Sequence, residues 1–133
     1  MKRWLLLLLW LCSIKPAAAQ GYVDGRLVLG REFAEKHLQA AIADSARQKV
    51  VARQRRLPIA SLSDTAAALS AIEPLLFRAY GKKGIERQRP YEIYRIEEYW
   101  VINGTLPYGY FGGVFIVVVD ARNSRVLELI HGQ

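Results

Sequence analysis

The chain has 133 residues, 52% of them hydrophobic, and its 19 basic and 12 acidic side chains give a net charge of +7. This length fits a single domain, and the presence of one cysteine excludes a framework of disulfide bonds. The first residues predict a signal peptide, because two basic residues precede the apolar run Trp4–Ile14, and Pro16 and three alanines follow it. We expect residues 1–19 to be removed by cleavage after Ala19.

Export predicts a periplasmic or secreted protein with a single domain at residues 20–133. The apolar run of the signal is shorter than the roughly 20 residues that span a bilayer, so no stable membrane insertion is expected after cleavage. The signal carries three basic residues and no acidic ones, which leaves 16 basic and 12 acidic side chains and a net charge of +4. On an exported protein this mild excess favours an acidic protein partner or a soluble surface over nucleic acid.

Two helices are predicted ahead of the main strands. Residues 20–30 contain three glycines and indicate an extended lead-in or an edge strand. From Arg31 onward apolar residues recur at helical spacing, and we expect this helix to stop between Gln48 and Arg56. A second helix follows a cap at Ser63 or Asp64 and ends at the glycines within residues 81–84.

Four strands are predicted at residues 88–97, 99–103, 114–120 and 126–131, and a loop rich in glycine occupies residues 104–113. The run 114–120 is apolar at successive positions, which is typical of a central strand covered on both faces. Helices followed by consecutive strands predict an α+β fold. We expect two N-terminal helices packed on a curved four-stranded antiparallel meander.

The segments YGKKGIERQRPYEIY and YWVINGTLPYGYFGGVFIVVVDARN and the closing HG resemble a family of bacterial immunity proteins with a fold like nuclear transport factor 2. The resemblance extends over about residues 33–132 and is densest from Tyr80 onward. It implies a nuclear-transport-factor-2-like, cystatin-like fold and a non-enzymatic protein that neutralises the cognate toxin domain of a polymorphic toxin system. The residue after the loop proline is commonly lysine in this family, and here it is Tyr108.

The loop at residues 104–113 holds the candidates for partner contact. Tyr108, Tyr110 and Phe111 lie among glycines, and aromatic side chains on a loop bury a large area at little entropic cost. The alternative is that the glycines permit a tight bend and the rings fold back onto the core. Arg87 and Arg95, around the first predicted strand, are candidates for contact with an acidic toxin surface.

No catalytic, metal-binding or cofactor-binding motif is present in the sequence, so we expect no cofactor. Arg89 is expected to pair internally with Glu92 or Glu86. The alternative function is a small-molecule-binding or enzymatic member of the same cone-shaped fold, with Glu92 or Glu128 as a general base. A protease inhibitor of the cystatin shape is disfavoured because the Gln-x-Val-x-Gly loop is absent. The identity of the toxin and the oligomeric state stay open.

Overall fold

The computed structural model describes residues 21–47, 56–59 and 61–132. The signal peptide, its cleavage after Ala19 and the segment in which the first helix was expected to stop lie outside these residues and stay predictions. Within the described residues, no helix is long and apolar enough to cross a membrane. The mixed composition of helices and antiparallel sheets confirms the predicted α+β class.

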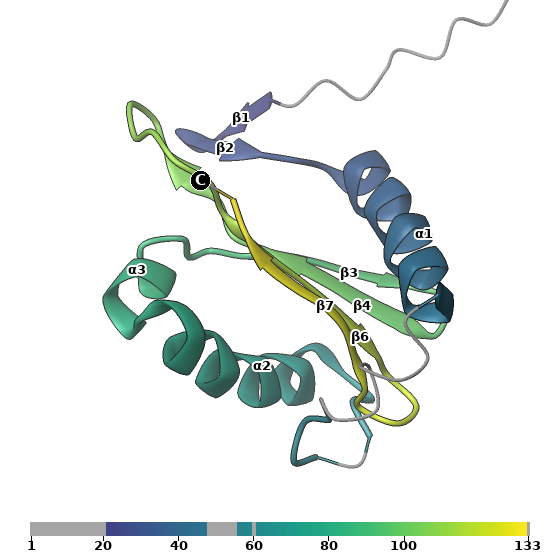
Figure 1. The fold of residues 1–133 in the computed structure, drawn as a ribbon. Coiled ribbons are helices and arrows are strands. Elements are labelled where there is room, and N and C mark those ends of the chain that lie inside the picture. Colours follow the sequence, from purple (N-terminus) through teal and green to yellow (C-terminus); the bar gives the residue numbers. More distant parts are fainter. Residues whose placement is uncertain (1–20, 48–55, 60, 133) are drawn as a thin grey trace, which may run out of the picture.

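A four-stranded antiparallel sheet forms the centre of the molecule (Figure 1). Its strands lie in the order β3 (Glu92–Ile96), β4 (Tyr99–Asn103), β6 (Phe115–Asp120) and β7 (Val126–His131). All six residues of β6 are buried, because its neighbours on both sides and the helices on both faces exclude water. The expectation of a central strand covered on both faces is therefore confirmed.

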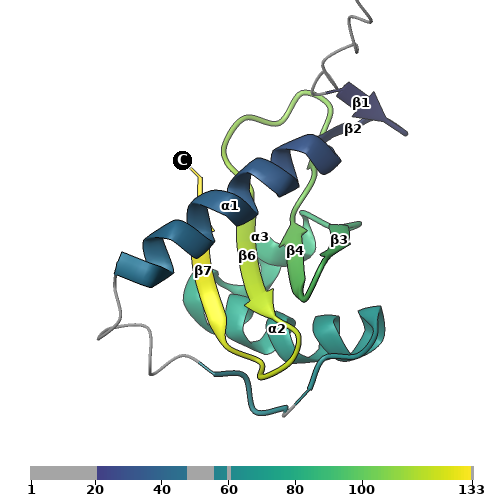
Figure 2. The ribbon, with the colours of Figure 1, turned by 90° about the vertical axis from the view of Figure 1, so that its right-hand side faces the viewer.

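The two long helices pack on opposite faces of this sheet (Figure 2). The first, α1 (Arg31–Arg47), buries Ala34, Leu38 and Ala41 against Val101 and Val118. These helical residues recur at intervals of three and four, so they form one stripe along α1. The sequence predicted helices that pack on the sheet but not that the sheet separates them.

The second helix, α2 (Thr65–Tyr80), contacts the other face of the sheet. The carboxylate of Asp64 accepts a hydrogen bond of 2.8 Å from the backbone N–H of Ala67, as expected of an N-cap. A short third helix, α3 (Lys82–Glu86), follows directly and was not predicted as a separate element. Gly81 joins the two helices at a positive φ of 88°, which explains the glycine there.

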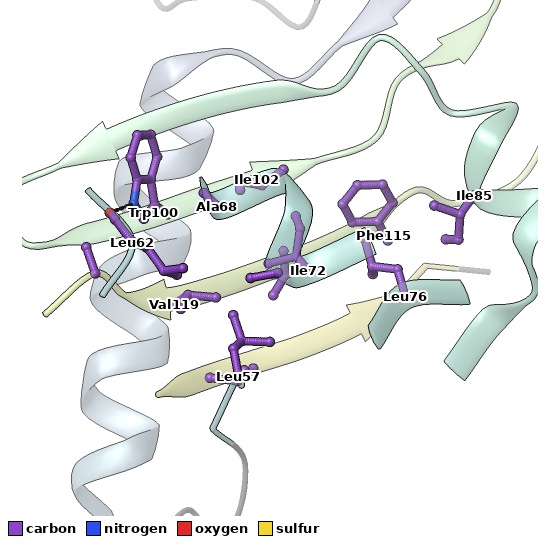
Figure 3. Packing of buried hydrophobic residues seen from close by; sticks show 14 residues of the cluster. Leu57, Leu62, Ala68, Ile72, Leu76, Ile85, Trp100, Ile102, Phe115 and Val119 are labelled. Atoms are coloured by element: carbon purple, nitrogen blue, oxygen red, sulfur yellow. Dashed lines mark hydrogen bonds between the residues drawn. The ribbon is translucent and has the colours of Figure 1, made fainter. Parts of the chain in front are cut away.

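The larger hydrophobic core lies between α2 and the sheet (Figure 3). Ile72 and Leu76 of α2 pack with Phe115 and Ile102 of the sheet, and all four are fully buried. Trp100 closes one end of this core, where its indole N–H donates a hydrogen bond of 2.8 Å to the carbonyl of Leu62. Burying each of the large apolar side chains stabilises the fold by about 1.5–3 kcal/mol.

A second, smaller sheet extends from one end of the molecule (Figure 1). It contains β1 (Gly21–Val23), β2 (Arg26–Val28) and β5 (Leu106–Pro107), all antiparallel, in the order β1-β2-β5. Residues 20–30 were predicted to be an extended lead-in or an edge strand. In the structure, residues 21–28 form a hairpin of two strands. The strand expected from Gln88 begins instead at Glu92, because the preceding residues form a turn that ends in Pro90, which has no N–H for a ladder.

Candidate functional site

The loop between β5 and β6 carries the most exposed large hydrophobic side chains of the described residues. Phe111 is 99% exposed, Tyr108 75% and Tyr110 63%. The alternative in which these rings fold back onto the core is therefore wrong for this structure. A single exposed apolar side chain is ordinary, whereas several such side chains on one loop are typical of an interaction site.

The β1–β2 hairpin adds two further hydrophobic side chains to the same end of the molecule. Tyr22 is 60% exposed and Val23 56% exposed. The rings of Tyr22 and Tyr108 meet edge to face, with centroids 5.4 Å apart. We call this end of the molecule, which carries the exposed side chains of Tyr22, Val23, Tyr108, Tyr110 and Phe111, the aromatic tip. Tyr22 and Val23 could not be recognised from the sequence, because no local signal indicates that the hairpin pairs with β5.

Backbone contacts fix the loop where it leaves the small sheet. The N–H of Tyr108 donates a hydrogen bond of 2.7 Å to the carbonyl of Gly25, and the N–H of Tyr110 donates one of 3.1 Å to Pro107. Gly109 and Gly112 adopt positive φ values of 82° and 126°, which other residues rarely adopt. The loop therefore has defined turns even though its side chains are exposed.

The other end of the loop packs against the C-terminal residues. A Cβ on Gly113 would collide with the backbone of Gly132, so the two chain segments touch through their main chains. The N–H of Gly132 donates a hydrogen bond of 3.1 Å to the carbonyl of Val114. This contact ties the loop to the end of β7.

Gln88 organises the base of the loop from a buried position. Its Oε1 accepts a hydrogen bond of 2.8 Å from the N–H of Phe115, and its carbonyl accepts one of 2.9 Å from the N–H of Thr105. Because Oε1 is the acceptor, the amide nitrogen of Gln88 faces His131 Nε2 at 2.9 Å. Gln88 is 3% exposed and was expected to be a strand residue, but its role is to join the start of β6 to the end of β7.

Arg87 is exposed and lies beside the small sheet that carries the aromatic tip. Its carbonyl accepts a hydrogen bond of 2.6 Å from the Arg26 guanidinium, which also donates one of 2.6 Å to the hydroxyl of Thr105. Arg26 in turn pairs in register with Pro107, at the start of the loop. The structure therefore brings Arg87 to the same end of the molecule as Tyr108, Tyr110 and Phe111.

Arg95 lies at the opposite end of the main sheet, next to the β3–β4 turn. Its guanidinium stacks over Trp100 at 5.2 Å and donates a hydrogen bond of 2.8 Å to the carbonyl of Glu97. An ion pair with Glu98 at 3.5 Å holds it further. Arg95 is exposed and could be reached by a partner only at the end of the molecule opposite the aromatic tip.

Arg89 pairs internally, although its main partner is not one of the two that were predicted. It donates hydrogen bonds of 2.6 and 3.0 Å to Glu73 of α2, while Glu86 lies at a more distant 3.9 Å. The hydroxyl of Tyr91 donates to the same Glu73 oxygen at 2.8 Å. Burial raises the pKa of Tyr91 to about 12, and this hydrogen bond contributes to the shift.

The carboxylate of Glu92 is fully engaged in holding the start of α1. It accepts hydrogen bonds from the N–H groups of Leu29 and Gly30 at 2.7 and 2.9 Å. The hydroxyl of Tyr94 and the amide of Asn103 donate to it as well, at 2.9 and 2.7 Å. Burial and the Glu92 contact raise the pKa of Tyr94 to about 12. The oxygens of this carboxylate are thus occupied by four donors from the fold itself.

Glu128, the other acid considered as a general base, lies 3.0 Å from His37 Nε2. The pair joins β7 to α1, beside an open cleft of about 260 Å³ that Glu128 lines with Asp44 and Ser45. A carboxylate and a histidine alone do not assemble a metal site. In the part of the chain that the structure describes, no group of three or more His, Cys, Asp or Glu side chains is placed to hold a metal ion.

Comparison with known proteins identifies the family. Residues 66–133, just over half of the chain, match the sequence profile of NTF2 fold immunity proteins. The chain belongs to the NTF2 fold immunity protein family. This match confirms the family that was predicted from the resemblance of the sequence. No solved structure gives a significant match.

Two curated relatives of this NTF2 fold immunity protein come from Escherichia coli (strain K12). The uncharacterized protein YhhH is 33% identical over 73 residues, which are 54% of this chain and 58% of that protein. The uncharacterized protein YbbC is 38% identical over 55 residues, 41% of this chain and 45% of that protein. The chain thus spans about half the length of the curated relatives that it matches.

Only part of the aromatic tip lies within the residues that match the family. It begins within α2 and includes the main sheet and the loop that carries Tyr108, Tyr110 and Phe111. Tyr22 and Val23 precede it, in a hairpin outside the matched residues. This NTF2 fold immunity protein therefore builds its most exposed surface from a family segment and from a segment that the family match does not contain.

Proposed function

We propose that this protein is an exported immunity protein that binds the cognate toxin domain of a polymorphic toxin system and thereby blocks it. The observation that carries the proposal is membership of the NTF2 fold immunity protein family. A protein toxin domain is the partner that such a family implies. The exposed aromatic side chains at one end of the fold support a role in protein binding, because aromatic residues are enriched at binding hot spots.

The mechanism is occlusion without chemistry, and it requires no cofactor. Glu92, one of the two acids considered as general bases, supports this proposal because four hydrogen-bond donors occupy its carboxylate. Export to the periplasm follows from the predicted signal peptide, and it would place the protein where an incoming toxin arrives.

Co-expression with a toxin provides the test. The toxin domain encoded beside this gene is produced with and without the immunity protein, and growth of the host is measured. We expect the immunity protein to restore growth and to form a complex with the purified toxin domain that gel filtration and calorimetry detect. Rescue without a complex would indicate an enzymatic or indirect mechanism, and neither rescue nor a complex would refute the proposal.

A further inference from the structure

We infer that the aromatic tip is the surface that contacts the toxin, and that its counterpart is an apolar depression edged by acidic side chains. This inference rests on the proposed immunity function and adds the location and chemistry of the contact. It also assigns a role to Tyr22 and Val23, which lie outside the residues that match the family.

Exposure is the first argument. Eight large hydrophobic side chains of the described residues are exposed, and five of them form the aromatic tip. The other three, Ile59, Tyr80 and Ile130, lie in the linker before α2, at the end of α2 and in β7. A cluster of this kind is the usual mark of an interaction site, whereas single exposed hydrophobic residues are ordinary.

Preorganisation is the second argument. Hydrogen bonds from Tyr108 to Gly25 and from Tyr110 to Pro107 fix the backbone of the loop, and the Tyr22 ring supports the Tyr108 ring. At the other end the loop is tied to Gly132 by direct backbone contact. A loop that is ordered before binding loses less entropy when a partner covers it. Phe111, at 99% exposure, is the side chain with most area to bury and is the expected anchor.

Charge is the third argument. The guanidinium of Arg26 is occupied by Thr105 and the carbonyl of Arg87, so it serves the fold. Arg87 itself is exposed at the base of the aromatic tip and adds positive charge to its edge. The chain without the predicted signal is basic as well, with a net charge of +4. Acidic side chains around an apolar depression are the complement of such a surface, and they would steer association.

The experiment compares two matched pairs of variants in binding to the toxin domain by calorimetry. Phe111→Ser in the aromatic tip is compared with Ile59→Ser, an exposed hydrophobic residue in the linker. Arg87→Glu is compared with Arg78→Glu, which makes the same charge change on α2. We expect Phe111→Ser to raise Kd at least about 30-fold and Arg87→Glu to raise it about 5- to 10-fold, with the Arg87 effect smaller at high salt.

The controls Ile59→Ser and Arg78→Glu should leave Kd within about 2-fold of the wild-type value, and circular dichroism should show that all four variants are folded. If the wild-type protein binds the toxin domain and Phe111→Ser binds it with the same affinity, the aromatic tip is not the contact surface. The proposed immunity function would then still stand. Absence of wild-type binding would refute the proposed function itself.

Two further measurements address other occupants of this surface. Sedimentation of the wild-type protein would overturn the inference if it showed a dimer that Phe111→Ser dissociates, because the tip would then join two copies of this chain. Co-sedimentation with phosphatidylglycerol vesicles would overturn it if the wild type bound and Phe111→Ser did not, because the tip would then contact lipid. We expect a monomer that does not bind the vesicles.

Discussion

Gly104 stands at the end of β4, where the chain turns toward the loop of the aromatic tip. A Cβ at this position would lie 2.7 Å from the Cβ of Gln88 and would collide with its Oε1. Gln88 has no room to withdraw, because it is buried and its Oε1 accepts the N–H of Phe115. The glycine is therefore required by the space that Gln88 fills and not by its own φ.

Replacement of Gly104 by alanine should lower the free energy of unfolding by about 1–3 kcal/mol, the usual cost of overpacking a buried site. Urea unfolding monitored by tryptophan fluorescence measures it. Gly84→Ala in α3 is the control, since a Cβ there meets nothing within 4 Å. It should leave stability unchanged or raise it slightly. Equal changes in the free energy of unfolding for the two substitutions would mean that the Gln88 side chain moves aside without cost.

Asp120, at the end of β6, makes the stability of the fold depend on pH in the acid range. Burial raises the pKa of this carboxyl, but hydrogen bonds from the side chain and backbone of Arg122 outweigh that effect and hold the pKa below its usual value of 3.8. The folded form then retains the charge at pH values where the unfolded chain has taken up a proton. The stabilisation is present above about pH 4 and is lost as the pH falls through this range.

Asp120→Asn should therefore flatten this part of the stability profile. We expect the free energy of unfolding of the wild type to fall more steeply between pH 5 and about pH 3 than that of the variant. Urea titrations at a series of pH values measure both slopes. Parallel profiles would show that other carboxylates dominate acid unfolding.

At the scale of elements, α1 depends on a side chain from a different layer. The first N–H groups of a helix have no partner within it. Here Glu92 of β3 accepts hydrogen bonds from Leu29 and Gly30, immediately before α1 begins. The negative carboxylate is also favoured at this position by the helix dipole. Glu92 thus ties the two residues between β2 and α1 to the main sheet.

Glu92→Gln should lower the free energy of unfolding by about 2 kcal/mol, because hydrogen bonds to a charged acceptor are lost. Hydrogen exchange should show faster opening of the α1 amides than of those in α2. Glu35→Gln, which removes only an exposed ion pair with Arg31, should cost about 0.5 kcal/mol or less. A uniform rise in exchange across both helices would contradict a local role for Glu92.

Much of this arrangement could be predicted from the sequence, where the signals are local. The apolar run at 114–120 identified β6, and the two possible caps Ser63 and Asp64 indicated the start of α2, where Asp64 is the cap. The contact between Tyr22 and Tyr108 could not be predicted, because it joins residues far apart in the chain. The same holds for the pairing of Arg89 with Glu73, which was expected to involve a nearer glutamate.

At the scale of the whole molecule, the predicted export has a direct test. The last residues of the predicted signal, Ala17 to Ala19, are small enough for a signal peptidase, and Ala19→Arg should prevent recognition of the site. Mass spectrometry of a periplasmic extract should find a wild-type chain that begins at Gln20. The variant should remain unprocessed and associated with the membrane fraction. A wild-type chain of full length would exclude cleavage at this site.

The two ends of the molecule carry different surfaces. One end of the molecule carries the aromatic tip and Arg87, and the other carries the β3–β4 turn with Arg95 held over Trp100. Sequence reasoning grouped Arg87 and Arg95 because they lie eight positions apart around one predicted strand. A strand places its two ends at opposite edges of a domain, so such neighbours in sequence need not share a partner.

The contact between Gly113 and Gly132 has a practical consequence for anyone who handles this protein. The described chain starts in β1, within the aromatic tip, and ends beside the base of the same loop. A bulky group attached next to either end of the described residues would therefore crowd this end of the molecule and mask the aromatic tip. The β6–β7 turn lies at the far end, and its exposed Asn123 is the better place for a label.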